Sequence, residues 1–483
     1  MKNLTGLLIK LFLFLLIFFM LLNCLGDYFI SKKSGHRTWE SFYMQPKKSI
    51  DILFMGNSHV GNGIDLNIIN VKTKANASTI YSSGKVLDQI YYSFEEALRY
   101  QSPKLLVIET FAIPSDSIYY FKNPVKENEI PFNAKIQSFD SKKLNFVKYR
   151  EYNDLYKEEK FLRTFFPTIR NHSNWSRKDF IRDNIFNNLN KNNSFYKGSS
   201  NSVTMLSNER VKEYEEKSFK KRVFRISNRQ RSYFNKIKEL AKVNGIEIVL
   251  LTIPYFKEYR DKINYKSFHD EINNLASENN IKHLDLNVVF KDWDNTYFSN
   301  ENVGHNQHVN YKGAIELSNY LANYIQKNFN FKEKREHTIY PEYYLYNNII
   351  RDSLNNGNRI LGNLDKLNGT KRLKFNVQQG KSSIVLYGWA AIENQESKNN
   401  EIFIGLKSDD GKFYVSKETQ FKPIKRTDVS KYFKKGNIYD HTGFHINVNS
   451  MLLHKGLYKI FMIVRSPKGE VLVKNSGKSV EII

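Results

Sequence analysis

The chain has 483 residues, 41% of them hydrophobic and 14% aromatic, so it is too long for one ordinary core and too apolar to be disordered. Its 74 Lys and Arg outnumber 49 Asp and Glu, and the net charge of +25 favours an anionic partner such as a phospholipid surface, an acidic polymer or nucleic acid. Nucleic acid is the least favoured, because the sequence shows no paired Cys/His spacing and no recognition helix, and the single Cys24 excludes an intrachain disulfide.

The chain begins with an apolar stretch at residues 4–25 that is broken mainly by Lys10. At a rise of 1.5 Å per residue, about 22 helical residues span a hydrocarbon core of about 30 Å, and the Lys10 stem can carry its charge to the membrane surface. We therefore predict a transmembrane helix within residues 1–27, as a single-pass anchor in the cell membrane, with the bulk of the chain extracytoplasmic.

Two other interpretations of this N-terminus stay open. One is a cleaved signal peptide, although no small-x-small cleavage site follows the apolar stretch. The other is a lipoprotein modified at Cys24, although Asn23 stands where a small residue is needed. Lys32, Lys33 and Arg37 argue against export by the positive-inside rule, but long domains translocate largely regardless of flanking charge.

Residues 28–48 are interpreted as a linker, and from residue 49 short apolar runs alternate with amphipathic helical patterns. The runs predict strands at residues 49–55, 78–81, 105–109, 247–252 and 283–286. The helical patterns predict helices at residues 86–100, 231–243 and 311–329. Strands that alternate with helices are typical of a parallel sheet covered on both faces, so residues 49–330 are predicted to form an α/β domain.

Residues 112–226 interrupt this alternation with a polar stretch rich in Asn and Lys. A segment of this length between two strands is more typical of a subdomain than of a loop, so we predict an inserted helical cap, with a poorly ordered insertion as the alternative. Its Phe165, Phe166 and Trp175 would provide apolar cover for a site that must exclude water.

The last part of the chain is predicted to fold separately. Residues 331–375 are interpreted as a charged connector. Residues 376–483 are predicted to form an antiparallel β-sandwich, because short alternating runs are separated by turn signals such as those at residues 409–411 and 467–469.

Chemistry is suggested first by Gly56-Asn57-Ser58-His59, which follows the first predicted strand directly. Gly56 allows a tight turn, and the turn places the Ser58 hydroxyl at the carboxyl edge of the sheet, where open α/β sheets bind their ligands. The backbone amide of Ser58 can then face a developing oxyanion. The alternative is that Asn57 or Ser58 only caps a helix.

A second candidate residue, His308, stands just before the last predicted helix. From there its imidazole can reach back across the carboxyl edge to Ser58. It would act as general base toward the serine hydroxyl and then as general acid toward the leaving group. We therefore predict that Ser58 and His308 converge, although they are far apart in the sequence.

These two motifs resemble those of the SGNH (GDSL-like) hydrolases, which carry a serine block after the first strand and an Asp-x-x-His block before the last helix. The matching residues are Gly56, Asn57, Ser58, His59, His308, Asn310, Gly313 and Ala314. The resemblance covers about residues 49–330 and implies a flavodoxin-like three-layer fold. It also matches Gly84 to the glycine whose amide helps to form the oxyanion hole.

The anchor followed by this domain is similar to the bacterial surface-polymer acyltransferases, which include the D-alanine transfer protein of teichoic acids and the alginate acetylation proteins. The resemblance implies that Ser58 accepts an acyl group and passes it to an extracellular glycan or another anionic polymer. A membrane-bound O-acyltransferase would be the partner, and no cofactor is implied. The alternatives are an SGNH esterase that deacylates a surface glycan and a non-catalytic glycan-binding scaffold.

The catalytic acid departs from the family pattern, because His305 stands three residues before His308, where the family has its Asp. A second histidine cannot serve as the buried anion that orients the imidazole. We assign Asp294 to this role, with Glu301 or a Ser–His dyad as alternatives. His305 and His308 make a poor zinc site, since no carboxylate or cysteine stands at ligand spacing, so no metal is expected.

The oxyanion hole also departs from the pattern. The family supplies an asparagine after the third strand, whereas this chain has Glu109 and Thr110. We assign the oxyanion donors as the amides of Ser58 and Gly84 with the hydroxyl of Thr110. Glu109 is expected either to pair with a nearby cation or to act directly in the chemistry.

The C-terminal part resembles the accessory β-sandwich domains of bacterial cell-envelope polysaccharide enzymes. Trp389 in an early strand is interpreted either as a core residue or as a ring that stacks on a sugar. Arg426 and Asp428 are expected to pair and fix a loop.

Overall fold

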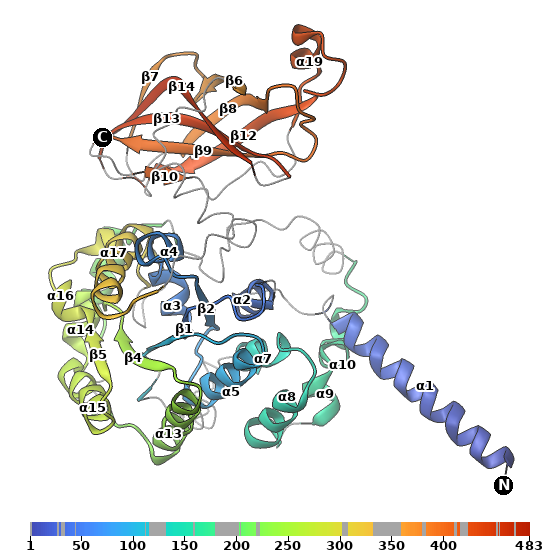
Figure 1. Cartoon of the computed structure of the whole chain (residues 1–483). Helices are drawn as coiled ribbons and strands as arrows, with labels where there is room; N and C mark the ends of the chain where they lie inside the picture. The colour runs from blue at the N-terminus through green and yellow to red at the C-terminus, as the bar shows by residue number, and fades with distance from the viewer. Residues whose placement is uncertain are drawn as a thin grey trace.

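The computed structural model of the chain shows a mixed α/β domain, a β-sandwich and a long N-terminal helix (Figure 1). It describes residues 2–26, 29, 34–43, 45–111, 113–114, 132–157, 160–178, 202, 204–218, 223–301, 308–331, 359–378, 383–409, 413–415, 424–450, 453, 455–467 and 470–483.

A parallel five-stranded sheet forms the centre of the α/β domain, with the strand order β2-β1-β3-β4-β5. Its strands are β1 (Ile52–Gly56), β2 (Ala77–Tyr81), β3 (Leu105–Glu109), β4 (Glu247–Thr252) and β5 (Lys282–Asp285). This is the flavodoxin-like order, in which ligands bind at the carboxyl ends of β1 and β3. The predicted fold class is therefore confirmed.

Helices cover both faces of the sheet, because the central strands bury side chains in both directions. On β3, Leu106 and Ile108 join one apolar core, and Leu105 and Val107 join the other. The helices of the first face are α2 (Ser34–Tyr43), α5 (Leu87–Leu98), α13 (Asn228–Val243) and α15 (Tyr265–Glu278). Those of the second face are α3 (Ser58–Gly63), α4 (Leu66–Thr73) and α17 (Tyr311–Asn328). Shorter helices are α14 (Lys257–Lys262), α16 (Leu286–Val289) and η3 (Asn295–Tyr297).

Helix α2 corrects the prediction of a linker at residues 28–48. Its Trp39 and Phe42 are 1% and 0% exposed and belong to the core of the α/β domain. Thr38 donates to the carbonyl of Tyr81 on β2, which ties the helix to the sheet. A helix this short gives a weak periodic signal, and its burial depends on strands far along the chain.

The described part of the inserted segment is mainly helical. Its aromatic side chains pack near the end of the N-terminal helix, which differs from the lid predicted for them. Its helices are α7 (Phe132–Asp140), α8 (Phe146–Glu151), η1 (Tyr152–Tyr156), α9 (Phe161–Phe165), α10 (Pro167–Arg170), η2 (His172–Asn174) and α12 (Asn208–Glu216). Phe165 and Phe166 are buried in a cluster with Leu22 of α1 (Lys2–Gly26), and Trp175 packs against Phe29. Phe165 and Phe166 therefore pack against the last turns of α1, and Trp175 packs against the turn that follows it.

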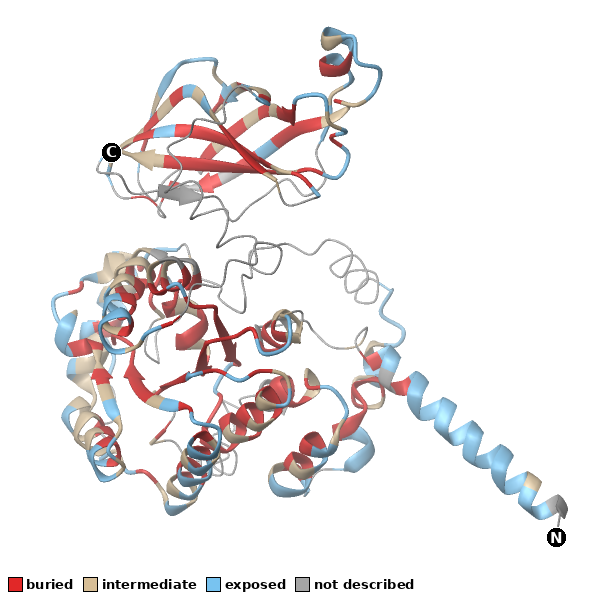
Figure 2. Cartoon of the chain, in the orientation of Figure 1, coloured by how far each residue is buried: buried red, intermediate tan, exposed pale blue. Residues whose placement is uncertain are grey.

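Helix α1 is the one described helix that is long and apolar enough to cross a membrane, over Leu4–Gly26. A signal sequence near an N-terminus passes the same test of length and composition. The helix stands away from the domain with its apolar side chains exposed, whereas its last turns pack against α10 (Figure 2).

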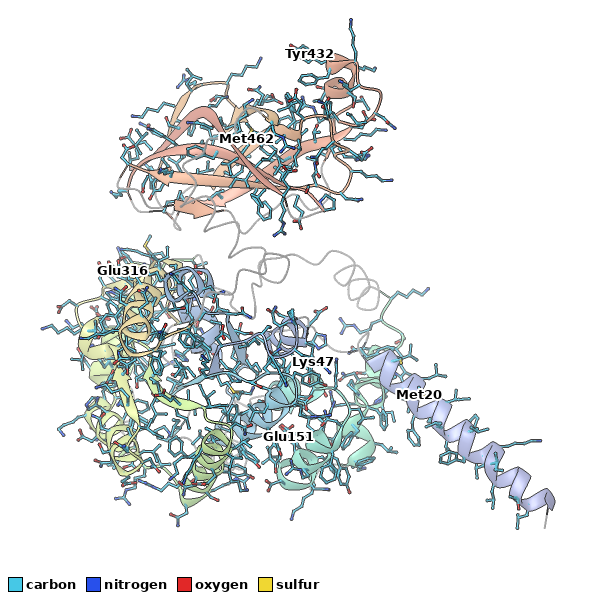
Figure 3. The ribbon with its side chains drawn as sticks, in the orientation of Figure 1. Met20, Lys47, Glu151, Glu316, Tyr432 and Met462 are labelled. Atoms are coloured by element: carbon cyan, nitrogen blue, oxygen red, sulfur yellow. The ribbon has the colours of Figure 1, made fainter. Side chains whose placement is uncertain are left out.

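The C-terminal part is a β-sandwich whose two sheets enclose one apolar core, in which Met462 is 1% exposed (Figure 3). One sheet contains β10 (Phe413–Val415), β9 (Glu401–Ser408), β13 (Gly456–Arg465), β14 (Val471–Ile482) and β7 (Lys374–Val377). The other contains β11 (Ile424–Lys425), β12 (His441–Asn449), β8 (Ser383–Ile392) and β6 (Ile360–Leu367). The pairs are antiparallel except β14–β7. The sandwich thus includes β6 and the first two residues of β7 from the predicted connector at residues 331–375.

Two side chains of the sandwich can be compared with their predictions. Trp389 is half-buried and packs against Phe433 of α19 (Thr427–Phe433), with ring centres 5.9 Å apart, so it takes part in a small apolar cluster. Arg426 and Asp428 form an ion pair at 2.8 Å, as predicted.

Candidate active site

The turn between β1 and α3 presents Ser58 at the carboxyl edge of the sheet. Asn57 is the N-cap of α3, and its side-chain oxygen accepts the His59 N–H at 2.9 Å. A Cβ atom on Gly56 would lie 2.7 Å from the Cβ of Glu109, so only glycine fits where β1 passes β3. Because Asn57 fills the capping role, the hydroxyl of Ser58 is available for another partner.

That partner is His308, as predicted. Its Nε2 lies 2.6 Å from the Oγ of Ser58, which is within the distance a general base requires. The His308 carbonyl accepts the N–H of Ser299 at 2.8 Å and the Ser299 hydroxyl at 3.0 Å. The backbone of His308 is thus held as well as its ring.

Asn310 fixes the same loop to the start of α17. It is completely buried, and its side-chain oxygen accepts the Gly313 N–H at 3.2 Å as the N-cap of that helix. Its amide group donates to the carbonyls of Thr296 at 2.8 Å and Phe298 at 3.1 Å. One side chain therefore joins the helix that follows His308 to the turn that precedes it.

The acid beside His308 is Glu301. Its two carboxylate oxygens lie 2.7 and 2.8 Å from Nδ1 of His308, and one of them also accepts the Ser299 hydroxyl at 2.8 Å. A carboxylate at Nδ1 orients the ring so that Nε2 faces the serine. Ser58, His308 and Glu301 therefore form a continuous hydrogen-bonded series.

Asp294, which we assigned to this role, lies elsewhere. Its Oδ1 accepts the N–H of Thr296 at 2.9 Å and the Thr296 hydroxyl at 2.6 Å, so it caps the turn η3. Asp side chains readily bond backbone N–H groups two residues ahead, and here this local contact takes precedence. The assignment of Asp294 as the acid is wrong. His305 lies outside the described residues.

The two amides that were expected to form the oxyanion hole belong to turns that follow neighbouring strands of the sheet. Ser58 occupies the first position of α3, where a helix leaves its N–H groups without intrahelical acceptors. Gly84 follows β2 in a turn with φ +63°, a left-handed conformation that favours glycine. Since β2 pairs with β1 through Tyr81 and Gly56, both turns leave the same edge of the sheet.

The third expected donor, Thr110, does not face this edge. Its hydroxyl is completely buried and lies 2.6 Å from the hydroxyl of Thr252, which in turn lies 2.8 Å from Nε2 of His283. Side chains alternate along a strand, so Thr110 points to the face that carries α13 and α15, opposite α3 and α17. The assignment of Thr110 to the oxyanion hole is therefore wrong.

Glu109 is a buried carboxyl group directly beneath the nucleophile turn. It is 2% exposed, and its Oε1 accepts the N–H of Phe111 at 2.8 Å. Burial raises the pKa of Glu109 to about 8, although the N–H groups of Phe111, Asn57 and Thr110 oppose this rise. The group is thus mostly neutral at pH 7, and the expected ion pair with a cation is not found among the described residues.

A largely buried aromatic cluster, which the sequence did not predict, lies next to Ser58 in the chain. The ring of His59 stacks on Phe111 at 4.2 Å and lies 4.8 Å from the ring of His308. Phe111 in turn contacts Tyr255 at 5.5 Å. The signal available in the sequence was the position of His59 directly after Ser58, on the first turn of a helix.

The described side chains of the site are partly exposed to solvent. Ser58 is half-buried, and the side chains of His308 and Glu301 are 16% and 29% exposed. Among the described residues, no group of three His, Cys, Asp or Glu side chains is arranged to hold a metal ion. The chemistry available to these residues is nucleophilic attack by a serine assisted by a histidine.

The fold and the site together define an α/β protein with a serine–histidine–carboxylate series at the carboxyl edge of its sheet. The sequence matches no family model and none of the curated proteins. Two solved structures are similar to the chain, each over 60% of its length and with a TM-score of 0.27. One is a proposed acylhydrolase from Bacteroides fragilis, with 14% identity and 93% of its own chain covered. The other is a GDSL-like lipase from Bacteroides thetaiotaomicron, with 12% identity and 98% covered.

Proposed function

We propose that this protein is a serine-dependent acyl-transfer enzyme held at a membrane by α1, with Ser58 as nucleophile and His308 as catalytic base. The observation that carries the proposal is the unbroken contact from Ser58 through His308 to Glu301. A serine that merely capped α3 would need no histidine at its hydroxyl, and that histidine would need no carboxylate. A non-catalytic scaffold would have no use for the same series.

The reaction would proceed in two halves. In the first, His308 Nε2 takes the Ser58 proton as Oγ attacks the acyl carbonyl, and the amides of Ser58 and Gly84 stabilise the oxyanion. Collapse of this intermediate breaks the bond to the leaving group, which receives the proton from His308, and leaves an acyl-serine. In the second half, His308 takes a proton from the acceptor hydroxyl, which attacks the acyl-serine and restores the Ser58 hydroxyl.

The acceptor in our proposal is a hydroxyl group of an extracellular anionic glycan or teichoic-acid-like polymer. The net charge of +25 favours such a polymer, and a membrane helix would hold the enzyme beside it. A membrane-bound O-acyltransferase would deliver the acyl group from the other side of the membrane. The contacts of α1 with Phe166 and Thr168 support a retained helix rather than a cleaved signal sequence.

Hydrolysis of the same acyl-serine is the second candidate function. The observation that favours it is the exposure of His308 and Glu301, because water that reaches His308 can replace the acceptor hydroxyl. The protein would then be an esterase that removes acyl groups from a surface glycan.

The test uses the full chain in lipid nanodiscs with p-nitrophenyl acetate as acyl donor. It measures the release of p-nitrophenol and the acetylation of the peptide that contains Ser58. The wild type should acetylate this peptide, whereas Ser58→Ala should not, and Ser58→Ala or His308→Ala should lower the rate by about 10³-fold or more. Ser173→Ala, at an exposed serine in η2, is the matched control.

Adding a polymer acceptor separates the two candidate functions. Acetyl groups that move onto the polymer at the expense of free acetate support transfer. Free acetate in unchanged yield supports the esterase. If the wild-type protein neither acetylates Ser58 nor releases p-nitrophenol, both functions are contradicted.

A further inference from the structure

The inserted helices contact α1 well below its last residue. The ring of Phe166 stacks on Phe19 with centres 5.4 Å apart, and the Thr168 hydroxyl donates to the carbonyl of Leu22 at 2.9 Å. Phe19 precedes Gly26 by seven residues, which corresponds to about 10 Å along the helix axis. The segment that holds Phe166 thus lies alongside α1 from the end of the helix back to Phe19.

This depth places the segment at a lipid surface if α1 spans a membrane, a condition that rests on the proposed function. The 23 residues of Leu4–Gly26 extend about 34 Å, only slightly more than a hydrocarbon core of about 30 Å. Phe19, about 10 Å from the end of the helix, then lies below the headgroups among the outer acyl chains, and a side chain that packs beside it must enter the same outer part of the bilayer. The exposed side chains of α1, such as Met20, show the part of the helix that lipid would surround (Figure 3).

The surface of this segment has the composition that such a layer requires. Phe161, Leu162 and Trp175 are 44%, 46% and 54% exposed, although all three are large and apolar. Tryptophan favours the headgroup level of a membrane. Transfer of exposed apolar side chains of this kind from water to the edge of the acyl chains lowers the free energy.

The charges of the same segment have one sign. Residues 160–178 include no Asp or Glu, and their cations are Lys160, Arg163, Arg170, Arg177 and Lys178. Arg170 is buried and forms an ion pair with Asp140 of α7. The other four cations are exposed, and near a membrane each contributes about 1 kcal/mol of attraction to an anionic leaflet.

We propose that residues 160–178 form a membrane-docking surface for an anionic phospholipid leaflet. Phe161, Leu162 and Trp175 enter the interface, and the flanking cations contact the lipid phosphates. The α/β domain is then attached at two places, through α1 and through this surface, so it cannot rotate freely about the helix. The occupant is the membrane that holds α1, since the surface is continuous with the lipid-facing side of that helix.

The test places an environment-sensitive NBD label on the full chain, with Cys24→Ser removing the native thiol. Single cysteines are introduced as Leu162→Cys, Trp175→Cys and, as a matched exposed control on α13, Val243→Cys, which replaces a residue that is 83% exposed. The labelled proteins are inserted into vesicles of phosphatidylcholine alone or mixed with phosphatidylglycerol. At positions 162 and 175 we expect blue-shifted NBD emission and quenching by lipid-borne nitroxides. Both effects should be stronger in the vesicles that contain phosphatidylglycerol, and neither should occur at position 243.

Two further variants make the outcome decisive. Charge reversal by Lys160→Glu with Arg163→Glu should abolish the phosphatidylglycerol effect, whereas Lys434→Glu with Lys435→Glu on the sandwich should leave it unchanged. Ser58→Ala should not alter any label signal, so a failure of the proposed catalysis leaves this test intact. Emission at positions 162 and 175 that equals emission at position 243 in both vesicle types would overturn the proposal.

Discussion

Two carboxyl groups near Ser58 occupy very different surroundings. Glu301 is 29% exposed and accepts hydrogen bonds from Ser299 and His308. Glu109 is buried beneath the turn that holds the nucleophile and has only backbone N–H groups as neighbours that lower its pKa. The first is placed to orient and balance an imidazolium, and the second accepts backbone N–H groups around the turn on which Ser58 stands.

Removing the Glu301 carboxylate should reduce acyl transfer strongly. Glu301→Ala is expected to lower kcat by about 10²–10⁴-fold, because the His308 ring loses the partner that selects its tautomer. Asp294→Ala is the matched control and should cost only a turn cap, about 1 kcal/mol of unfolding free energy, with kcat nearly unchanged. Steady-state kinetics on a small ester checks both, and equal losses of kcat in the two variants would restore Asp294 as the acid.

Glu109 should make stability depend on pH. Its pKa is raised from 4.5 to about 8 in the folded state, so its protonated form is favoured there and its contribution to stability is complete below about pH 4.5. This contribution is lost as the pH rises toward 8. Glu109→Gln, which resembles the neutral acid, should therefore be more stable than wild type at pH 9 and similar at pH 5.

Urea denaturation at the two pH values measures this difference. Glu239→Gln, at an exposed position of α13, is the control and should leave the pH dependence of the wild type unchanged. A Glu109→Gln variant with the same pH dependence as wild type would show that Glu109 has an ordinary pKa.

At the level of secondary-structure elements, the junction between η3 and α17 determines where His308 stands. Phe298 and Val309 form an antiparallel bridge, and Asn310 binds both sides of it. Because these bonds are buried, each is costly to leave unmade. The position of His308 thus depends on a polar side chain that is completely buried.

Asn310→Ala should lower both stability and turnover. Loss of its buried hydrogen bonds is expected to cost about 1–3 kcal/mol of unfolding free energy, and His308 should then sit less firmly at Ser58. Asn319→Ala in the same helix removes only a bond to the carbonyl of Ile315 and serves as control. Denaturation and ester kinetics are measured together, and unchanged kinetics in Asn310→Ala would argue against a positioning role.

At the level of the whole molecule, the residues of the site all come from the α/β domain. The sandwich has its own apolar core, built from both of its sheets. A chain that ends after residue 331 should therefore keep its activity on a small soluble ester within about twofold. If the sandwich binds the polymer, the shortened chain should lose activity on a polymer acceptor. If the shortened chain loses activity on the small ester as well, the sandwich completes the site.

The sequence by itself determined the elements whose signal is local. The buried strands are continuous apolar runs, so β3 and β4 were predicted with their observed bounds, and Ser58 and His308 follow from the positions of their motifs at strand and helix ends. Parallel strands place such ends at one edge of the sheet, and this rule was sufficient to predict that the two side chains meet.

Only the tertiary structure decided the remaining features. Asp294 and Glu301 are both plausible acids in sequence, and the choice depends on how the chain returns from η3 toward His308. Thr110 was assigned to the wrong face of the sheet. It follows the last residue of β3, and the sequence does not show whether the alternation of side chains continues past the end of the strand. Phe165 and Phe166 are apolar in any interpretation, but their partner, α1, lies more than one hundred residues away in sequence. Long-range packing selects among contacts that local sequence leaves equally favourable.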